Sequence, residues 1–489
     1  ANSMGGNGDD NGYHIALGTD ESIYLAGEFR GSADFDPSSS SANRNSNGND
    51  DFFLARYDSS GNYKWVHAFG NSSTDRLGDL VCDSINHVFI TGYFVDSIDF
   101  DPSNSNYVGL FGVGGDVYVA SYDSAGSFRF ANKFGENSFQ QGTSLALDGK
   151  SNLFIGGSYV DSMDFDPGMG REMEYTPKNN GTSFVGKYSM FNGDYRSHYS
   201  AYDQRGGDDE ARKIAYGRDG FIYVIGSFAG ETNLASGDSL RFVVSNGGSD
   251  AFVAKYDTLG NNIWAFSIGG PGNDIGYDIA LDKNKNVYVG VQFTDSLDAD
   301  PGTGIDLKVG LRRSEILLAS YTDGGQYRWA HALSSGGDES IYRLTTDSSN
   351  NVIITGYFQS SIDFDPDTST NTLTARNRDI YLAKYTANGA HLWAYNFNGN
   401  SNEWGSDVAI GSDNAIYTTG YFNSTVDFDG SSSTLNKSSN GGSDIYLAKY
   451  DSMGIPEWVE SFGSTSSDLS NALTLDGSEN VYLTGYFQN

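Results

Sequence analysis

The chain has 489 residues and a formal net charge of −33, because 63 Asp and Glu residues stand against only 30 Lys and Arg residues. Such a charge repels phosphate backbones and anionic lipid surfaces, so it excludes nucleic acid as a partner and favours cations or basic surfaces. Aromatic residues (14%) and 62 glycines accompany only 8 prolines, which is typical of short strands joined by tight turns. No apolar stretch reaches the roughly 18 residues of a membrane span, so we expect no direct membrane insertion.

A repeat of about 65 residues organises the whole sequence. Its clearest run is Val88–Phe94, which occurs in eight copies with glycine at the fifth position of all but one, where Val291 stands. A second run, typified by Phe53–Tyr57, occurs in seven copies, and an aromatic residue follows most of them. Five of the six tryptophans share this second phase, which predicts that they pack in the core.

Each repeat predicts four strands, which we call A, B, C and D in chain order. Strand A is typified by Ser144–Asp148, strand B by Val88–Phe94 and strand C by Phe53–Tyr57, and strand D carries the tryptophan. Turns rich in Asp and Gly join A to B and C to D, as in ordinary hairpins. Four-stranded antiparallel blades repeated around an axis predict an all-β fold, the β-propeller.

We expect a single propeller domain over residues 1–489. The predicted repeats span approximately 1–70, 71–135, 136–205, 206–268, 269–332, 333–398 and 399–463, with a half repeat at 464–489. Strands A and B occur eight times but C and D only seven times. Since strand A lines the channel of a propeller, an eighth A strand outside a seven-blade ring would expose its apolar face. Eight blades, the last one incomplete, are therefore favoured, and seven blades are the alternative.

The spacing of the recurrent residues resembles the SBBP β-propeller repeat. The residues that carry the resemblance are Gly-Asn-Asp274, Ile-Ala-Leu-Asp282, Asp298-x-Asp300-Pro301 and the strand C run that ends at Asp257, with its turn and tryptophan. The likeness covers essentially the whole chain in register. It implies a propeller that is secreted or displayed on the surface of a bacterium, especially one of the Bacteroidota, and it implies no reaction. The family name refers to seven blades.

Carboxylates recur at three places in the repeat: the start of A, the loop after B and the start of C. Because a blade is an up-and-down meander, we expect all three places on one face. The start of A carries Asp10, Asp75, Gln140, Asp209, Asp274, Glu339, Glu403 and Asp468, and the start of C carries Asp51, Asp116, Thr182, Asp250, Glu315, Asp379 and Asp444.

The loop after B carries pairs in the pattern Asp-x-Asp, usually before proline. Residues i and i+2 of a strand point the same way, so each pair offers two hard oxygen ligands of the kind that calcium takes. An acid upstream of the pair, or one at the start of C, would add ligands. The candidate calcium ligands are Asp34, Asp36, Asp96, Asp99, Asp101, Asp116, Asp161, Asp164, Asp166, Asp295, Asp298, Asp300, Asp363, Asp365, Asp427 and Asp429. The alternative is that they accept hydrogen bonds from backbone N–H groups of the loops.

A specific binding site is expected where the repeat is broken. Segment 171–218 loses much of the pattern and concentrates basic residues, of which Arg196, Arg205 and Arg212 are candidates for a protein contact. Solvated charges without a partner are the alternative. Trp404, the one tryptophan out of phase, follows Glu403 in the predicted D–A loop. There both residues are candidate ligand or partner contacts, with the indole placed to stack on a sugar or anchor a partner, and local packing is the alternative.

These features predict a secreted or cell-surface scaffold that binds other molecules, stabilised by calcium and without an organic cofactor. Its partner is expected to be a protein or glycan at the cell surface, or neighbouring copies of the chain. Three alternatives remain: a subunit of a surface assembly or filament, a lectin-like carbohydrate binder, and a glycoside hydrolase. Paired carboxylates can run glycoside hydrolysis. Pairs that recur in six repeats belong to the scaffold, however, so we expect no catalytic residue.

Overall fold

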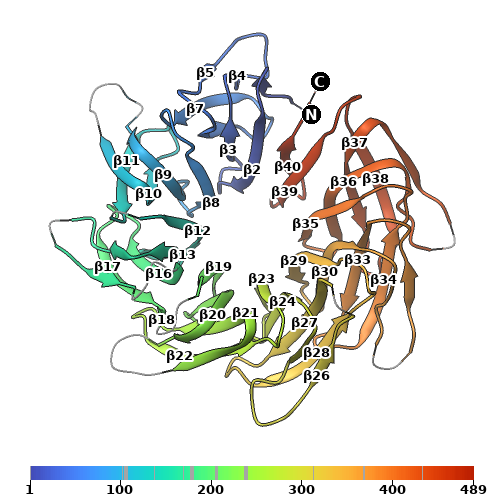
Figure 1. Ribbon diagram of the computed structural model, residues 1–489. Helices are drawn as coiled ribbons and strands as arrows, with labels where there is room; N and C mark the ends of the chain where they lie inside the picture. Colours follow the sequence, from blue (N-terminus) through green and yellow to red (C-terminus); the bar gives the residue numbers. More distant parts are fainter. Residues whose placement is uncertain are drawn as a thin grey trace. The chain divides into compact units, whose positions relative to one another are not determined.

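The computed structural model describes residues 2–101, 103, 108–136, 138–168, 170–176, 181–203, 207–235, 241–311, 313–366, 369–431 and 433–488. Within these residues every regular element is a β-strand, as the sequence predicts (Figure 1). The chain divides into two compact units. Unit 1 comprises Ala1–Tyr216, Asn233–Leu240 and Thr258–Asn261, and unit 2 comprises Gly217–Thr232, Arg241–Asp257 and Asn262–Asn489.

Unit 1 contains three runs of four antiparallel strands. Sheet 1 orders β2 (Asp10–Leu17), β3 (Ile23–Phe29), β6 (Asp51–Tyr57) and β7 (Tyr63–Phe69). Sheet 2 orders β8 (Arg76–Cys82), β9 (Val88–Asp99), β10 (Gly109–Tyr122) and β11 (Phe128–Phe134). Sheet 3 orders β12 (Gln140–Leu147), β13 (Asn152–Val160), β16 (Gly181–Ser189) and β17 (Tyr195–Ser200). The other strands are β1 (Gly5–Gly6), β4 (Ser32–Asp34), β5 (Asn43–Asn45), β14 (Ser162–Asp164), β15 (Met173–Tyr175), β18 (Tyr202–Asp203) and β19 (Glu210–Tyr216).

Unit 2 continues the pattern. Sheet 4 orders β20 (Ile222–Asn233), β21 (Phe242–Tyr256) and β22 (Asn262–Ile268), and sheet 5 orders β23 (Ile275–Leu281), β24 (Val287–Phe293), β27 (Glu315–Tyr321) and β28 (Tyr327–Leu333). Sheet 6 orders β29 (Ser340–Thr346), β30 (Val352–Phe358), β33 (Asp379–Tyr385) and β34 (His391–Phe397). Sheet 7 orders β35 (Trp404–Ile410), β36 (Ile416–Asp427), β37 (Asn436–Tyr450) and β38 (Pro456–Phe462), and β39 (Leu469–Leu475) pairs with β40 (Val481–Tyr486). Small hairpins join β25 (Ser296–Asp298) to β26 (Leu307–Val309) and β31 (Ser361–Asp363) to β32 (Thr372–Thr374).

The four-stranded antiparallel sheets confirm the predicted repeat. In every sheet except sheet 4 the four strands follow in the chain order A, B, C, D, so the meander is the one that the hydrophobic runs predict. Central strands are buried on both faces, as in β33, where all seven residues are buried. Such sheets must cover both faces with neighbours of the same kind, which defines a propeller-like repeat fold.

Three of the five phased tryptophans join consecutive sheets, beyond the core packing that the sequence predicts. Trp329 on β28 is 9% exposed, and its indole N–H donates to the carbonyl of Ala387, 3.0 Å away in the C–D turn of the next sheet. Gly389 in that turn has φ +85°, and a Cβ there would lie 2.6 Å from the Trp329 ring, so the turn needs glycine. The same bond joins Trp65 to Ser124 (3.1 Å) and Trp264 to Asp323 (2.8 Å).

A β-bulge interrupts strand A at one repeated position. In β29 the register shifts between Ile341 and Arg343, so Tyr342 is the extra residue. A bulge bends the strand and re-aims the side chains beside it. In three sheets the residue after the bulge is an acid that accepts a backbone N–H from the next A strand. These contacts are Asp79 to Leu145 (2.8 Å), Asp278 to Leu344 (2.9 Å) and Asp407 to Leu473 (2.8 Å).

Candidate functional site

The Asp-x-Asp pairs lie in loops that fold around the pairs themselves. Asp34 Oδ1 accepts hydrogen bonds from the N–H groups of Asp36 (3.1 Å) and Ala42 (2.7 Å). The first acid of each other pair accepts two such bonds in the same way: Asp99, Asp164, Asp298, Asp363 and Asp427. The second acids also accept loop hydrogen bonds: Asp36, Asp101, Asp166, Asp300, Asp365 and Asp429. These carboxylates cap their loops, as the alternative interpretation predicts.

The acids upstream of the pairs occupy one turn position. Asp96, Asp161 and Asp295 have φ values of 63°, 64° and 72°. This left-handed backbone favours glycine and tolerates Asp or Asn. Positive φ recurs at the equivalent places, which are Gly31, Gly230, Ser360 and Ser424. Turn geometry therefore accounts for these three acids.

The first Asp-x-Asp pair lies beside the segment that leads into strand A: Gly5 pairs with Asp34, and the N–H of Gly6 donates to Asp10 Oδ2, 2.6 Å away. Tyr57, the last residue of β6, donates its hydroxyl to the carbonyl of Phe35, which lies between the two acids of the first pair (2.8 Å). The Phe35 ring also packs on Phe29, the residue opposite Asp51, with centroids 5.6 Å apart. The loop after strand B therefore packs along β6 between these contacts. The hydroxyl contact of Tyr57 recurs at Tyr122, Tyr321, Tyr385 and Tyr450.

Asp116, predicted as a further calcium ligand at the start of strand C, is bound elsewhere. It is fully buried and accepts a hydrogen bond from Lys133 Nζ, 2.9 Å away. In the described part of the chain no group of three or more His, Cys, Asp or Glu side chains is arranged to hold a metal ion. The contacts of these residues therefore fit loop capping, the alternative interpretation, and an experiment decides whether the loops also bind calcium.

Thermal unfolding with and without divalent cations tests the prediction that they bind calcium. Because backbone N–H groups already satisfy the capping oxygens, we expect the same melting temperature in chelator and in added calcium. Substituting Asp34→Asn should lower the melting temperature equally in both conditions. A melting temperature that rises with calcium in the wild-type chain, and not in the variant, would establish the calcium site instead.

Trp404 begins strand β35, rather than lying in the preceding loop, and packs among aromatic rings. Its ring stacks on Tyr421, with centroids 5.7 Å apart, and on Tyr342 at 5.6 Å, and it contacts Tyr357 at 4.3 Å. The guanidinium of Arg378 lies 5.1 Å from the centre of the Trp404 ring and 4.8 Å from that of Tyr357. We call these five residues the aromatic platform.

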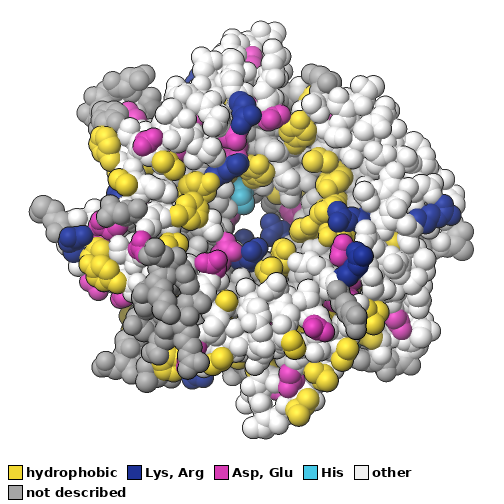
Figure 2. Space-filling model, viewed as in Figure 1, with side chains coloured by type: hydrophobic (Ala, Val, Ile, Leu, Met, Phe, Trp, Pro, Cys, Tyr) yellow, Lys and Arg dark blue, Asp and Glu magenta, His cyan; other side chains and the backbone are white. Residues whose placement is uncertain are grey.

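Strands of sheets 6 and 7 build the platform. Trp404 and Tyr421 stand opposite each other in the β35–β36 hairpin, and Tyr342 is the bulge residue of β29. Trp404, Tyr342 and Tyr421 keep partly exposed surface, and hydrophobic side chains gather over β29 and β35 in Figure 2. Burial raises the pKa of Tyr421 to about 12, so its hydroxyl stays a donor at neutral pH.

Arg378 gives the platform a positive charge. Its guanidinium contacts two ring faces, and within the described ranges no carboxylate forms an ion pair with it. A guanidinium held on aromatic faces keeps its N–H groups free to bind a carboxylate in bidentate geometry. In a chain with a net charge of −33, this cation favours an anionic ligand locally.

Glu403 does not face a ligand, which corrects the prediction made for it. Its side chain is fully buried and contacts the carboxyl group of Asp379. Burial, and then the charge of Asp379, raises the pKa of Glu403 to about 8. The residue belongs to the packing between sheets 6 and 7.

The predicted basic contact does not form one cluster. Arg196 is exposed on β17, the outermost strand of sheet 3. Arg212 lies on β19, which packs against β12 and β13 at the other side of that sheet, and its Nε is 3.0 Å from Glu210 Oε2. Several strand spacings of about 4.8 Å therefore separate the two arginines. Arg205 lies outside the described residues.

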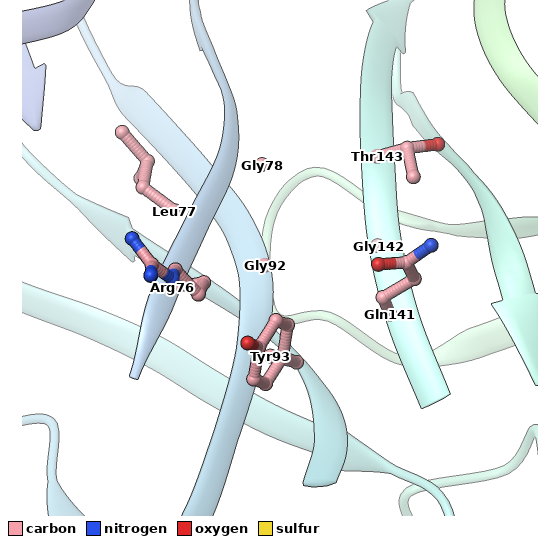
Figure 3. A pocket seen from close by; sticks show the side chains of 8 residues that line it. All are labelled: Arg76, Leu77, Gly78, Gly92, Tyr93, Gln141, Gly142 and Thr143. Carbon is pink, nitrogen blue, oxygen red and sulfur yellow. The ribbon is translucent and has the colours of Figure 1, made fainter. Parts of the chain in front are cut away.

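A cavity in unit 1 occupies the same place in the repeat as the platform does in unit 2 (Figure 3). Its volume is about 330 Å³, and it lies between β8–β9 and β12. Tyr93 has the repeat position of Tyr357, and Gln141 has that of Trp404. A glutamine thus leaves open the space that tryptophan fills. The lining residues are Arg76, Leu77, Gly78, Gly92, Tyr93, Gln141, Gly142 and Thr143.

The polar groups of the cavity already have partners, which distinguishes it from the platform. Arg76 forms an ion pair with Glu28, and Gln141 Nε2 donates to Glu210, 3.0 Å away. A ligand in the cavity would have to displace these contacts. The platform offers a guanidinium without an ion-pair partner in the described part of the chain, and partly exposed rings, so we take it as the candidate binding site.

The sequence predicts only one of the five platform residues, Trp404, as part of a binding site. Trp404 stands out because its phase breaks the repeat. Tyr357 and Tyr421 belong to the recurrent strand B run, which predicts core packing, and Arg378 has no distinguishing pattern. A signal was available in the bulge position, since Tyr342 shares its place in strand A with Tyr13 and Tyr277.

Fold and site together define a repeat protein of the all-β, propeller-like class. The chain is similar to an uncharacterised WD repeat-containing protein of Acanthamoeba polyphaga mimivirus, with 24% identity over 86% of this chain and 36% of the relative. It therefore spans about a third of the length of that relative. No family model matches the chain, so the SBBP resemblance is not confirmed.

Solved structures show only distant similarity. A rhamnogalacturonan lyase of Bacillus licheniformis aligns over 99% of this chain and 91% of its own, with 10% identity and a TM-score of 0.25. An extracellular domain assigned to a one-component system of B. thetaiotaomicron aligns over 99% and 81%, with 10% identity and a TM-score of 0.20. Scores of this size carry no argument about function. Among the described residues, no helix is long and apolar enough to cross a membrane.

Proposed function

We propose that this chain is a non-catalytic binding module outside the cell and that its ligand binds at the aromatic platform. The observation that carries the proposal is the Arg378 guanidinium on the faces of Trp404 and Tyr357. Arginine and aromatic residues dominate binding hot spots because they combine apolar area with directed hydrogen bonds. The recurrence of the other carboxylates in repeat after repeat supports a scaffold role for them.

The ligand class that fits the platform is a carbohydrate that carries a carboxylate. The partly exposed rings of Trp404, Tyr342 and Tyr421 offer a flat apolar surface for the sugar ring. Arg378 offers a planar fork of donors that matches a carboxylate. This is the lectin-like alternative, which expects exposed aromatic residues at this end of the strands.

The finer fold and the location are part of the proposal. The sequence holds eight copies of strands A and B, which supports a propeller with eight inner strands. The resemblance to the SBBP repeat supports a secreted or surface-displayed bacterial protein. Partners are then molecules at the cell surface, which suits a strongly acidic chain that nucleic acid repels.

Binding of the intact chain to an array of neutral and acidic glycans tests the function. We expect Trp404→Ala to weaken binding at least about tenfold, the equivalent of ~1.4 kcal/mol. Arg378→Gln should weaken binding of acidic glycans only, because it removes the charge and leaves the rings.

Phe111→Ala is the matched control, since Phe111 is an aromatic side chain 66% exposed outside the platform. Its binding should equal that of the wild-type chain. If no glycan binds, or if Trp404→Ala binds as tightly as the wild type, the platform is not a carbohydrate site.

A further inference from the structure

Seven joints between consecutive sheets repeat one arrangement. The side chain at the start of strand C of one sheet is buried beside the side chain at the start of strand A of the next. In five of these joints both residues are acids, and in two a neutral residue replaces one acid. The pairs are Asp51–Asp75, Asp116–Gln140, Thr182–Asp209, Asp250–Asp274, Glu315–Glu339, Asp379–Glu403 and Asp444–Asp468, and none of these side chains is more than 1% exposed.

The backbone brings the two side chains of a joint together. The N–H of Glu339 donates to the carbonyl of Ser314, 2.9 Å away, and that of Glu403 donates to the carbonyl of Arg378, 2.8 Å away. These carbonyls belong to the residues immediately before Glu315 and Asp379. The carboxyl groups of Glu315 and Glu339 lie close enough to share a hydrogen bond if one of them is protonated, as do those of Asp379 and Glu403.

In each of these two joints the facing oxygens lack a donor. Glu315 Oε2, Glu339 Oε2, Asp379 Oδ1 and Glu403 Oε2 are buried without a hydrogen-bond partner in the described structure. The other oxygens are satisfied locally, as where the N–H of Leu311 donates to Glu315 Oε1, 2.7 Å away. Two buried acceptors that face each other need a proton or a cation between them.

One of the two joints with a single acid, Asp116–Gln140, shows how the chain can balance a permanent charge. Gln140 cannot carry a proton for Asp116, and there Lys133 supplies a cation at 2.9 Å. The double-acid joints have no basic residue at this repeat position, which holds Ala68, Ser267, Ala332, Asn396 and Ser461. If both acids of a joint were ionised, the double-acid joints would need a lysine more than the Asp116 joint does. Because they have none at this position, we infer that a proton neutralises them.

A metal ion fits these joints less well. Calcium takes six to eight oxygen ligands, and no third ligating side chain joins a pair among the described residues. We propose that each double-acid joint holds a shared proton at neutral pH, so that the joints between sheets weaken as the pH rises. The fold then contains five equivalent acid-stabilised joints, four of them in unit 2.

The titration behaviour agrees with this geometry. Desolvation by burial raises the pKa of Asp51 and of Asp250 to about 7, against ordinary values near 4. It also raises the pKa of Asp379 and Glu339, where the neighbouring carboxyl adds to the effect at Glu339. These groups bind more protons in the folded than in the unfolded chain. Their contribution to stability is complete below pH 4 and is lost as the pH rises through about 7 to 8.

Other charged groups near the joints do not change the direction in which these pKa values shift. Asp50 and Asp96 face the first pair, and Asp295 faces Asp274, and all three raise the pKa values further. Arg376 acts in the opposite direction on Asp379. The effect of Arg376 on the pKa of Asp379 is smaller than the effects of burial and of two hydrogen bonds.

Calorimetry in buffers of different ionisation enthalpy tests the proposal, because it counts the protons released on unfolding. At pH 6.5 the wild-type chain should release protons and melt at a higher temperature than at pH 8.5. Glu339→Gln, which copies Gln140, should release one proton fewer and melt less differently at the two pH values. Asp379→Asn makes the same test in the next joint.

Asp9→Asn is the matched control, because it removes one charge from an exposed side chain outside the joints. It should leave the proton count unchanged. The infrared carbonyl stretch of protonated carboxyl groups at pH 6.5 tests the wild-type chain even if a variant does not fold. Unfolding without proton release, or a proton count that Glu339→Gln leaves unchanged, overturns the proposal. Proton release that appears only after chelation would assign the joints to a cation instead.

Discussion

Substituting Lys384→Met is expected to lower the free energy of unfolding by about 3–5 kcal/mol. Lys384 Nζ lies 2.9 Å from Asp347 Oδ2, and the two side chains are 2% and 1% exposed. The ammonium group also donates to the carbonyl of Ser452, 2.8 Å away. Methionine fills a similar volume but leaves the Asp347 carboxylate buried without its cation. Urea unfolding followed by tryptophan fluorescence measures the loss.

The pKa of Asp347 shows how strongly the buried carboxylate depends on its partners to stay ionised in the wild-type chain. Burial alone would raise it, yet hydrogen bonds from Asn351 and Lys384 hold it below the ordinary value. The matched control is Lys449→Met at the same position of the next sheet. Lys449 pairs with Glu457, whose side chain is 42% exposed, so its loss should cost less than about 1 kcal/mol. Equal losses in the two variants would contradict this account.

Substituting Trp329→Ala is the second large effect, with an expected loss of about 3–5 kcal/mol. The indole is 9% exposed, packs against His331 at 5.0 Å and Tyr288 at 6.1 Å, and donates to the turn of the next sheet. Alanine removes the packing and leaves a cavity between sheets 5 and 6. Thermal and urea unfolding of the intact chain measure the effect.

Two further variants separate packing from the hydrogen bond. Trp329→Phe keeps an aromatic ring but loses the N–H, and it should cost about 1–3 kcal/mol. Trp393 has the same phase, but it is only half-buried and its indole N–H has no acceptor among the described residues. Trp393→Ala should therefore cost clearly less than Trp329→Ala. A loss at Trp393 as large as that at Trp329 would show that the joints do not depend on this bond.

The sequence predicts the strands well because each is set by a local pattern. The Val88–Phe94 run and its copies are apolar, bounded by turns and rich in β-branched and aromatic residues, and each forms strand B. The path of the loop after strand B is not local. It depends on the hydroxyl of Tyr57, which reaches Phe35 across 22 residues. No spacing rule shows that contact, so the sequence does not predict how the loop packs on the sheet.

In the candidate site, too, the sequence predicts what depends on a local pattern and not what depends on packing. The broken phase of Trp404 identifies the place, because a residue that departs from a repeat is not needed by the repeat. Its surroundings depend on packing between repeats. Tyr342 and Arg378 come from the preceding repeat and reach Trp404 only after the sheets pack. The burial of Glu403 depends on the same packing. The sequence therefore predicts a ligand contact for a residue whose side chain is in fact buried.

The tryptophan bonds have a consequence for the order in which the chain acquires its structure. Trp65, Trp264 and Trp329 each donate to a turn that lies about 60 residues later in the chain. During synthesis on the ribosome, a sheet can therefore be complete while its indole N–H still lacks an acceptor. A buried donor without a partner costs about 1–3 kcal/mol, so each sheet stays incompletely stabilised until the following repeat emerges. Maturation of this fold is vectorial, and a stalled or truncated chain is weakest at its most recently made sheet.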